Sequence, residues 1–301
     1  MGRFTGRSAI VTDSRFGFIG LGSMGAPMAE RLLDRPGGLV VCDTRPEALD
    51  PFVAGGAEPV ADAAAVAERA AVISVAVVDD EQVRTVLTGP RGILRTAAAG
   101  TVVAVHSTIA DATAVALAAE CASAGVEFVD APVSGGAPAA QLGRLAVMVG
   151  GSEAAFARVR EPFGHFADLI VHAGGVGAGI RMKLARNLLH FVAFTAAAEA
   201  QRLAEAAGLD ITQLGRVVRH SDAVTGGPGA IMLRDTTAPV AADDFWFPIL
   251  RHVRDLGEKD LSLALALGRR LGVELPLARD ALGGLGAGLG VGGGDFRKER
   301  A

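Results

Sequence analysis

The sequence predicts an α/β domain with a doubly wound, mostly parallel sheet, joined by a long interdomain helix to an all-helical C-terminal domain. Two observations lead to this fold class. Up to about residue 176, short and continuous apolar runs alternate with helical patterns, as in parallel strands that are covered on both faces. From about residue 177 no strand-like run appears again, and helical patterns follow one another.

The predicted strands of the first domain are short apolar runs rich in valine and isoleucine. They cover residues 15–20, 39–43, 71–78, 101–106, 125–130, 145–150 and 169–174. Helical patterns such as EQVRTVL and DATAVALAAECASAG lie between most of them. This alternation predicts a first domain over residues 15–176, after a leader at 1–14 that we expect to be disordered.

One uninterrupted helix is predicted over residues 177–207. The stretch from about Gly179 to Ala207 has no proline and no interior glycine, and Gly208 is a good residue to end a helix. Its length of about 29 residues would span roughly 43 Å. Because it is apolar nearly all round, we expect it to be buried between two bodies. A helical domain over 208–290 and a flexible, glycine-rich tail over 291–301 follow.

The composition favours a packed globular protein without a nucleic-acid partner. The chain has 301 residues, half of them hydrophobic, with a formal charge of −4 and no cluster of lysine and arginine. No apolar run reaches the roughly 18 residues that a membrane-spanning helix needs. The first residues lack the apolar centre of a signal peptide, so we expect a cytoplasmic protein.

Two features exclude or disfavour particular enzyme classes. The chain contains no tyrosine, which excludes a reductase that donates its proton from a tyrosine. Its two cysteines, Cys42 and Cys121, stand alone in apolar surroundings, where we expect reduced and buried thiols. That spacing disfavours a cysteine-ligated zinc alcohol dehydrogenase, and we predict no metal site.

A glycine-rich turn predicts a dinucleotide-binding site. The pattern G-x-G-x-x-G is formed by Gly20, Leu21, Gly22, Ser23, Met24 and Gly25. It follows a predicted strand and opens a predicted helix. Gly20 allows the tight turn, Gly22 lets the backbone approach a pyrophosphate, and Gly25 lets the helix pack on the strand. The amino terminus of the helix then stabilises the phosphate charge, so we expect a Rossmann domain.

The end of the second strand bears on the choice between NAD and NADP. Asp43, Thr44 and Arg45 are expected to line the adenosine ribose. A carboxylate at Asp43 accepts hydrogen bonds from both ribose hydroxyls and repels a 2′-phosphate, which favours NAD. Arg45 could instead pair with that phosphate, or be a solvated loop residue.

Lys183 and Asn187 are the candidate catalytic residues. They are spaced i, i+4 and so share a face of the long helix, with His190 one turn further on. A lysine near the start of a buried helix has its pKa lowered by desolvation and by the positive end of the helix dipole, and can then transfer protons. Asn187 could fix the substrate's oxygen or the lysine. The alternative is an ordinary lysine at a helix start.

The stretch DAPVSGG, residues 130–136, is the candidate substrate-binding turn. Ser134 with the amides of Gly135 and Gly136 would form a compact anion cradle suited to a carboxylate. The alternative is a glycine turn with no ligand.

Four motifs in this order resemble those of the β-hydroxyacid dehydrogenases, which include 3-hydroxyisobutyrate dehydrogenases. They are GFIGLGSMGAPMA, DAPVSGG, GAGIRMKLARN and EKDLSLAL, and the resemblance covers roughly residues 16–290. It implies that Lys183 is the catalytic lysine, Asn187 its neighbouring asparagine and Lys259 a cofactor-side lysine. It also implies a Rossmann domain, an interdomain helix, a helical second domain, and dimers or tetramers whose contacts come from the helical domains.

The chain departs from the family's usual pattern in three places. His106 precedes Ser107-Thr108 where the family often has an acid, and Val77-Val78 stands where it often has a Leu-Pro loop. Val77 and Thr108 remain the expected cofactor contacts there. The segment DDFWFPILRHVRDLGEKD, which precedes the fourth motif, is longer and more aromatic than usual and suggests an altered substrate pocket.

The resemblance implies hydride transfer between NAD(P) and a small 3-hydroxy acid or its semialdehyde. Lys183 would relay the hydroxyl proton, and the cradle would bind the carboxylate. Imine reductases share the fold but usually lose the lysine, and a silent dinucleotide sensor is a second alternative. The alanine-rich later half of the long helix and the apolar second domain predict a homodimer at least, with its interface between about residues 190 and 290.

Overall fold

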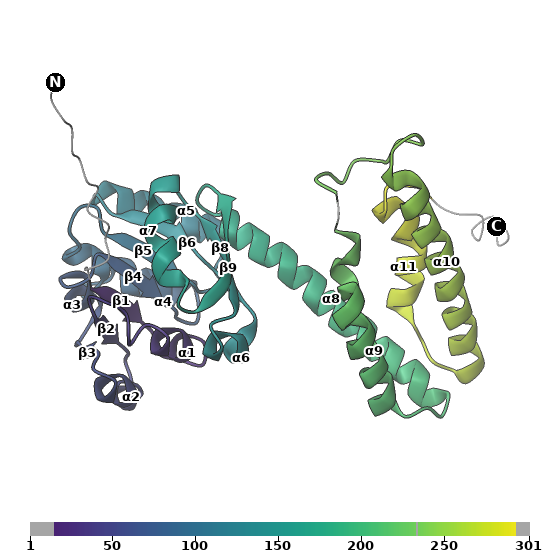
Figure 1. Ribbon diagram of the computed structural model, residues 1–301, viewed down its shortest axis with the longest axis horizontal. Helices are drawn as coiled ribbons and strands as arrows, with labels where there is room; N and C mark the ends of the chain where they lie inside the picture. Colours follow the sequence, from purple (N-terminus) through teal and green to yellow (C-terminus); the bar gives the residue numbers. More distant parts are fainter. Residues whose placement is uncertain (1–14, 233, 293–301) are drawn as a thin grey trace, which may run out of the picture. The chain divides into compact units, whose positions relative to one another are not determined.

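The computed structural model describes residues 15–232 and 234–292 of the chain. The predicted leader at 1–14 and residues 293–301 of the predicted tail lie outside the described residues. Two compact units divide the chain, one up to Arg186 and the other from Asn187 onward. The long helix begins in the first unit and ends in the second (Figure 1). None of the described helices is long and apolar enough to cross a membrane.

The first unit is a sheet covered by helices on both faces (Figure 1). Nine strands of its described residues form the sheet, in the order β3-β2-β1-β4-β5-β6-β8-β7, with β9 also paired to β8. The strands are β1 Phe16–Ile19, β2 Leu39–Cys42, β3 Glu58–Pro59, β4 Val72–Val75, β5 Val102–Val105, β6 Glu127–Asp130, β7 Val133–Ser134, β8 Leu145–Gly150 and β9 Ala167–Gly174. The six strands from β3 to β6 are parallel, whereas β8 runs antiparallel to β6. The predicted fold class is therefore confirmed.

Alternate residues of each central strand face opposite cores. Phe16 and Phe18 of β1 pack in one core with helices α1, α6 and α7, whereas Ile19 packs in the other with α3, α4 and α5. The helices of this unit are α1 Gly25–Glu30, α2 Asp50–Ala54, α3 Ala63–Ala67, α4 Asp80–Thr88, α5 Asp111–Ser123, α6 Gly136–Gln141 and α7 Glu153–Phe163. Both cysteines are buried and unpaired, and burial raises the pKa of Cys42 to about 11 and of Cys121 to about 12.

The long helix α8, Ala178–Ala206, is rooted in the first unit by its first turns. Ile180 is fully buried in the core that α5 covers, and Arg181 forms an ion pair of 3.3 Å with Asp111 at the start of α5. Each end of α8 lies within one residue of the corresponding end of residues 179–207, the stretch that has no proline and no interior glycine. The start of α8 thus has a fixed place relative to the sheet.

The second unit is helical throughout its described residues. It contains the later part of α8 with α9 Ile211–Thr225, α10 Trp246–Leu271 and α11 Pro276–Gly288. Glu199 of α8 is buried and accepts hydrogen bonds from the backbone N–H groups of Leu277 (2.8 Å) and Ala278 (3.1 Å). One carboxylate therefore caps the first turn of α11 and ties it to α8.

Candidate functional site

The glycine-rich turn between β1 and α1 has the backbone that a dinucleotide needs. Gly20 has a φ of +93°, and a Cβ there would overlap the carbonyl of Ala76. A Cβ at Gly25 would overlap the carbonyl of Gly20, so only glycine lets α1 pack this closely on the turn. A Cβ at Gly22 would meet nothing within 4 Å, which leaves open space at the position where the sequence predicts that a pyrophosphate approaches. The turn therefore fits the cofactor.

Asp43 lies at the carboxyl end of β2 and reaches back to this turn. Its carboxylate accepts hydrogen bonds from the backbone N–H groups of Leu21 (2.6 Å) and Arg45 (2.9 Å), and it pairs with the Arg45 guanidinium at 3.2 Å. Burial by itself would raise the pKa of Asp43, but the hydrogen bonds from Arg45 and Leu21 hold it below its usual range. Asp43 is thus a carboxylate at neutral pH, and much of the Arg45 charge is engaged by it.

Ser107 fixes the loop after β4, where Val77 was expected to contact the cofactor. Its hydroxyl accepts a hydrogen bond from the Val77 N–H (3.0 Å) and donates one to the Val77 carbonyl (2.6 Å). The neighbouring residues Val78 and Thr108 are exposed. The loop after β4 is therefore fixed by a residue that follows β5. It lies at the same edge of the sheet as the glycine-rich turn.

The predicted substrate turn joins β7 to α6. Ser134 is half-buried, and Gly135 and Gly136, both exposed, have φ values of +131° and +72°. A Cβ at Gly135 would come within 2.6 Å of the Ala139 Cβ, so glycine is required there by both backbone and space. The two amides and the hydroxyl thus belong to one tight and accessible turn.

A buried carboxylate joins this segment to the start of α8. Asp130, at the end of β6, is fully buried and accepts hydrogen bonds from the backbone N–H groups of Gly177 (2.6 Å) and Ile180 (2.7 Å). Burial raises the pKa of Asp130, and the two N–H donors oppose that rise. The glycines at the start of the helix make this contact possible, because a Cβ at Gly179 would lie 2.7 Å from the Asp130 carbonyl oxygen.

Lys183 lies five residues into α8, in the same unit as the turns described above. It is half-buried, and desolvation, followed by the charge of Arg186, lowers its pKa. Asn187 is one helical turn further on, at a spacing that puts both side chains on one helix face. Ser134 lies four positions after Asp130, which holds the first turn of the lysine's helix. The predicted substrate turn and the helix that carries Lys183 are therefore joined through the Asp130 carboxylate.

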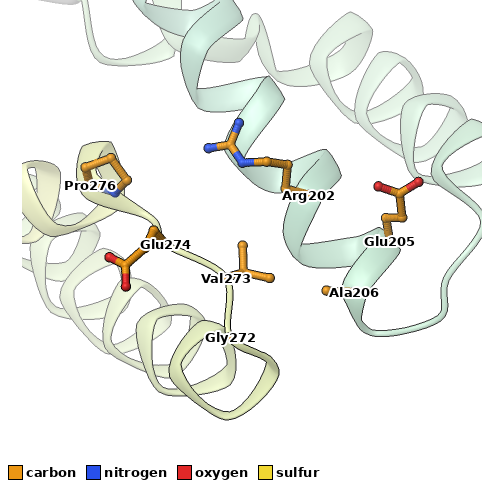
Figure 2. Close-up of a pocket in the computed structure, with 7 residues that line it drawn as sticks. All are labelled: Arg202, Glu205, Ala206, Gly272, Val273, Glu274 and Pro276. Atoms are coloured by element: carbon orange, nitrogen blue, oxygen red, sulfur yellow. The ribbon is translucent and has the colours of Figure 1, made fainter.

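The second unit holds the last predicted residue, Lys259. It lies in α10, and its ammonium pairs with Asp260 at 3.1 Å. Figure 2 shows an open pocket in this unit, between the end of α8 and the α10–α11 connection. The pocket carries charges of both signs and none of the predicted site residues; its lining residues are Arg202, Glu205, Ala206, Gly272, Val273, Glu274 and Pro276.

Three polar residues of this region carry no role in the sequence-based prediction. Asp130 and Ser107 were seen there only as parts of motifs, and His106 only as a departure from a pattern. The sequence does carry a signal for Asp130: an acid stands at the end of an apolar run just before Ala-Pro, as Asp43 stands at the end of the run 39–43. Its two partners, 47 and 50 residues away, could not be read from that signal.

Comparisons with known proteins agree with the two parts of the fold. The sequence profile of the NAD-binding domain of 6-phosphogluconate dehydrogenase matches residues 15–175. The profile of the NAD-binding domain of NADP-dependent 3-hydroxyisobutyrate dehydrogenase matches residues 177–295. The glycine-rich turn and the helical unit each fall within one of these matches.

Relatives cover nearly the whole chain. An uncharacterized oxidoreductase of Mycobacterium tuberculosis is 61% identical over 92% of this chain and 94% of its own. The 2-(hydroxymethyl)glutarate dehydrogenase of Eubacterium barkeri is 33% identical over 92% of this chain and 91% of its own. The crystal structure of a putative oxidoreductase from Mycobacterium avium superposes with a TM-score of 0.88 at 54% identity, covering 92% and 98% of the two chains. The chain therefore belongs to the β-hydroxyacid dehydrogenases, a family of NAD- or NADP-dependent oxidoreductases.

Proposed function

We propose that this enzyme oxidises the hydroxyl of a small 3-hydroxy acid to the semialdehyde, or runs the reverse reduction. The names of a matching profile and of a relative support this substrate class: 3-hydroxyisobutyrate and 2-(hydroxymethyl)glutarate both carry a hydroxymethyl group on the carbon next to a carboxylate. Ser134 and the amides of Gly135 and Gly136 bind that carboxylate. Lys183 exchanges a proton with the hydroxyl oxygen, and Asn187 orients the hydroxyl or the lysine.

The observation that carries this proposal is the contact made by Asp130. Its carboxylate holds the N–H groups of Gly177 and Ile180 and belongs to the segment that ends at Ser134. The carboxylate-binding turn and the helix of Lys183 are thus tied to one point of the sheet edge. This link fixes the distance between the turn that binds the substrate's carboxylate and the helix whose lysine meets its hydroxyl oxygen. Holding the reacting groups in place lowers the entropic cost of the reaction.

The protonation of Lys183 supports its role as the proton relay. A neutral amine accepts the hydroxyl proton during oxidation, and an ammonium returns it during reduction. Desolvation and the neighbouring Arg186 charge lower the pKa of Lys183, which brings the two forms closer in population at neutral pH. When bound, NAD(P) exchanges a hydride with the hydroxyl-bearing carbon, and the chain supplies position and charge.

NAD is the proposed preferred cofactor, and Asp43 supports that preference. Its carboxylate stays ionised at the turn because Arg45 and Leu21 donate hydrogen bonds to it. A 2′-phosphate at this place would face that negative charge. Arg45 is engaged by Asp43 at 3.2 Å, which reduces its value as a phosphate partner. Thr44, Val77, Thr108 and Lys259 complete the proposed cofactor contacts.

We further propose that the enzyme is a homodimer at least and acts in the cytoplasm. Helices α9 and α10 expose many apolar side chains, a common property of surfaces that bind another subunit. Examples are Val217, Val218, Val224, Ile249, Leu256 and Leu263. The interface would then lie within residues 190–290, and a tetramer is the alternative assembly.

The test is a spectrophotometric screen at ~340 nm, the absorbance of the reduced nicotinamide. NAD and NADP are each offered with a panel of 3-hydroxy acids, and NADH and NADPH with the matching semialdehydes and with cyclic imines. We expect turnover of a hydroxymethyl-bearing acid with NAD. Turnover of cyclic imines without any hydroxy acid would indicate an imine reductase. Nucleotide binding without turnover on either panel would indicate a dinucleotide sensor.

A further inference from the structure

His106, the residue that follows β5, is enclosed by aromatic rings. It is 5% exposed, and its imidazole stacks near Phe18 with ring centres 6.3 Å apart. The rings of Phe163 and Phe166 lie in edge-to-face arrangements with it, with ring centres 5.1 and 5.7 Å away. Desolvation in these surroundings lowers the pKa of His106 to about 4, against the smaller opposing effect of a hydrogen bond to Ala131. The imidazole is therefore neutral at physiological pH.

Both ring nitrogens have partners, and the partners fix the tautomer. Nδ1 lies 2.8 Å from the Ala131 carbonyl oxygen, and Nε2 lies 2.7 Å from the Ser74 hydroxyl. A carbonyl can only accept, so Nδ1 carries the hydrogen and donates it. In the neutral ring Nε2 then accepts the hydrogen of the Ser74 hydroxyl. The ring thus links β4 to the segment after β6.

Ala131 is the first residue after β6 and leads into the substrate turn. Its N–H continues the sheet by donating to Val105 (2.8 Å), and its carbonyl accepts from His106. It follows Asp130, which holds α8, and precedes Ser134 by three residues. The next residue, Pro132, accepts from the N–H of Met148 at 3.0 Å. The Ala131 carbonyl is therefore one of the backbone groups that fix the path of the chain into the turn.

Two consecutive residues after β5 hold two different loops. Ser107 holds the backbone of Val77 on the cofactor side, through both its N–H and its carbonyl. His106 holds Ala131 on the substrate side. Because the two residues act on separate loops, the structure predicts separate effects on cofactor and substrate binding when each is changed.

We propose that His106 is a positioning residue for the substrate, whose Nδ1–H fixes the Ala131 carbonyl and thereby the turn from Ser134 to Gly136. This inference rests on the proposed function of that turn as the carboxylate site. The bond from Nε2 to Ser74 anchors the ring but contributes nothing directly to the substrate turn.

Two substitutions separate the two ring nitrogens. In His106→Asn the side-chain amide reaches about as far as Nδ1, so it can still donate to Ala131 but cannot reach Ser74. In His106→Gln the amide reaches about as far as Nε2, so it can meet Ser74 but leaves the Ala131 carbonyl without its donor. Each variant loses one buried hydrogen bond, so both should lose comparable thermal stability.

The measurements are KM and kcat for 3-hydroxyisobutyrate, or for the best acid of the screen, and the Kd of NADH by fluorescence titration. We expect His106→Gln to raise the acid's KM by about tenfold while the NADH Kd stays within about twofold. His106→Asn and Ser74→Ala should keep KM within about threefold. Equal KM values for the Asn and Gln variants, or a rise in NADH Kd as large as the rise in KM, would overturn the proposal.

A second readout keeps this test independent of turnover. If the wild-type enzyme turns over no hydroxy acid, the proposed function fails, whereas the His106 contact is still measured by hydrogen exchange of the amides in residues 133–136. Faster exchange in His106→Gln than in His106→Asn supports the positioning role. Identical exchange in both variants contradicts it.

Discussion

Acidification provides a quantitative test of the environment of His106. The unfolded chain binds a proton at this side chain with a pKa near 6.5, whereas the folded pKa is about 4. Below the unfolded pKa the unfolded state gains a proton that the folded state cannot accept, so stability falls as the pH drops through this window. Between about pH 7 and pH 5 the loss from this one residue is about 2 kcal/mol, because each pKa unit corresponds to ~1.4 kcal/mol.

The assay is urea unfolding at both pH values, for the wild type and for His106→Asn. Far-UV circular dichroism is the suitable probe, since the single tryptophan, Trp246, lies in the second unit and does not report on the sheet. The Asn side chain does not titrate, so the variant should lose about 2 kcal/mol less than the wild type on acidification. Asp130, with its raised pKa, acts in the opposite direction, but it is present in both proteins and cancels. Equal losses in the two proteins would refute a buried neutral histidine.

Three further predictions concern cofactor choice, the start of α8, and assembly. Asp43→Ala should shift the ratio of kcat/KM values toward NADP, because the repelling carboxylate is removed and Arg45 is released; an unchanged ratio would mean that Asp43 does not set the preference. Asp130→Asn should destabilise the fold by about 1–3 kcal/mol in thermal unfolding, because the amide places its own N–H against the N–H of Gly177 or of Ile180. The same variant should lower kcat by roughly tenfold. Wild-type stability and kcat in that variant would show that the contact between Asp130 and the start of α8 is dispensable. Light scattering at micromolar concentration should give at least twice the 30.6 kDa of one chain, and a mass near one chain in active enzyme would refute the dimer.

The elements that the sequence predicted well are those with a local physical cause. Buried parallel strands are continuous apolar runs, and a long helix has no interior breaker, so both are visible within a short window. The glycine-rich turn was equally accessible, since its motif lies within one strand–turn–helix unit, where Gly20 has a positive φ and Gly25 packs against the Gly20 carbonyl. The two-residue strands β3 and β7, and the antiparallel pairing of β8, depend on neighbours rather than on local pattern.

The candidate site was only partly accessible to sequence reasoning, for a related reason. The spacing of Lys183 and Asn187 is local and shows their common helix face. The reach of Asp130 to Ile180, and of His106 to Ser74 and Ala131, depends on which strands lie side by side. Composition also hides the protonation states, because the low pKa of His106 comes from its burial, which the packing of several elements produces.

Lys183 is the residue to which the proposed proton transfer is assigned, and Lys183→Ala is the decisive variant. We expect turnover of the best acid to fall by about 10²–10⁴-fold while the NADH Kd stays within about twofold, because the lysine transfers a proton and does not bind the nucleotide. Arg186→Ala is the matched control: it removes a positive charge from the same helix and should keep turnover within about threefold. Since the Arg186 charge lowers the pKa of Lys183, this control should also move the rising limb of the pH–rate profile for oxidation to higher pH. Wild-type turnover in Lys183→Ala would contradict the proposed proton relay.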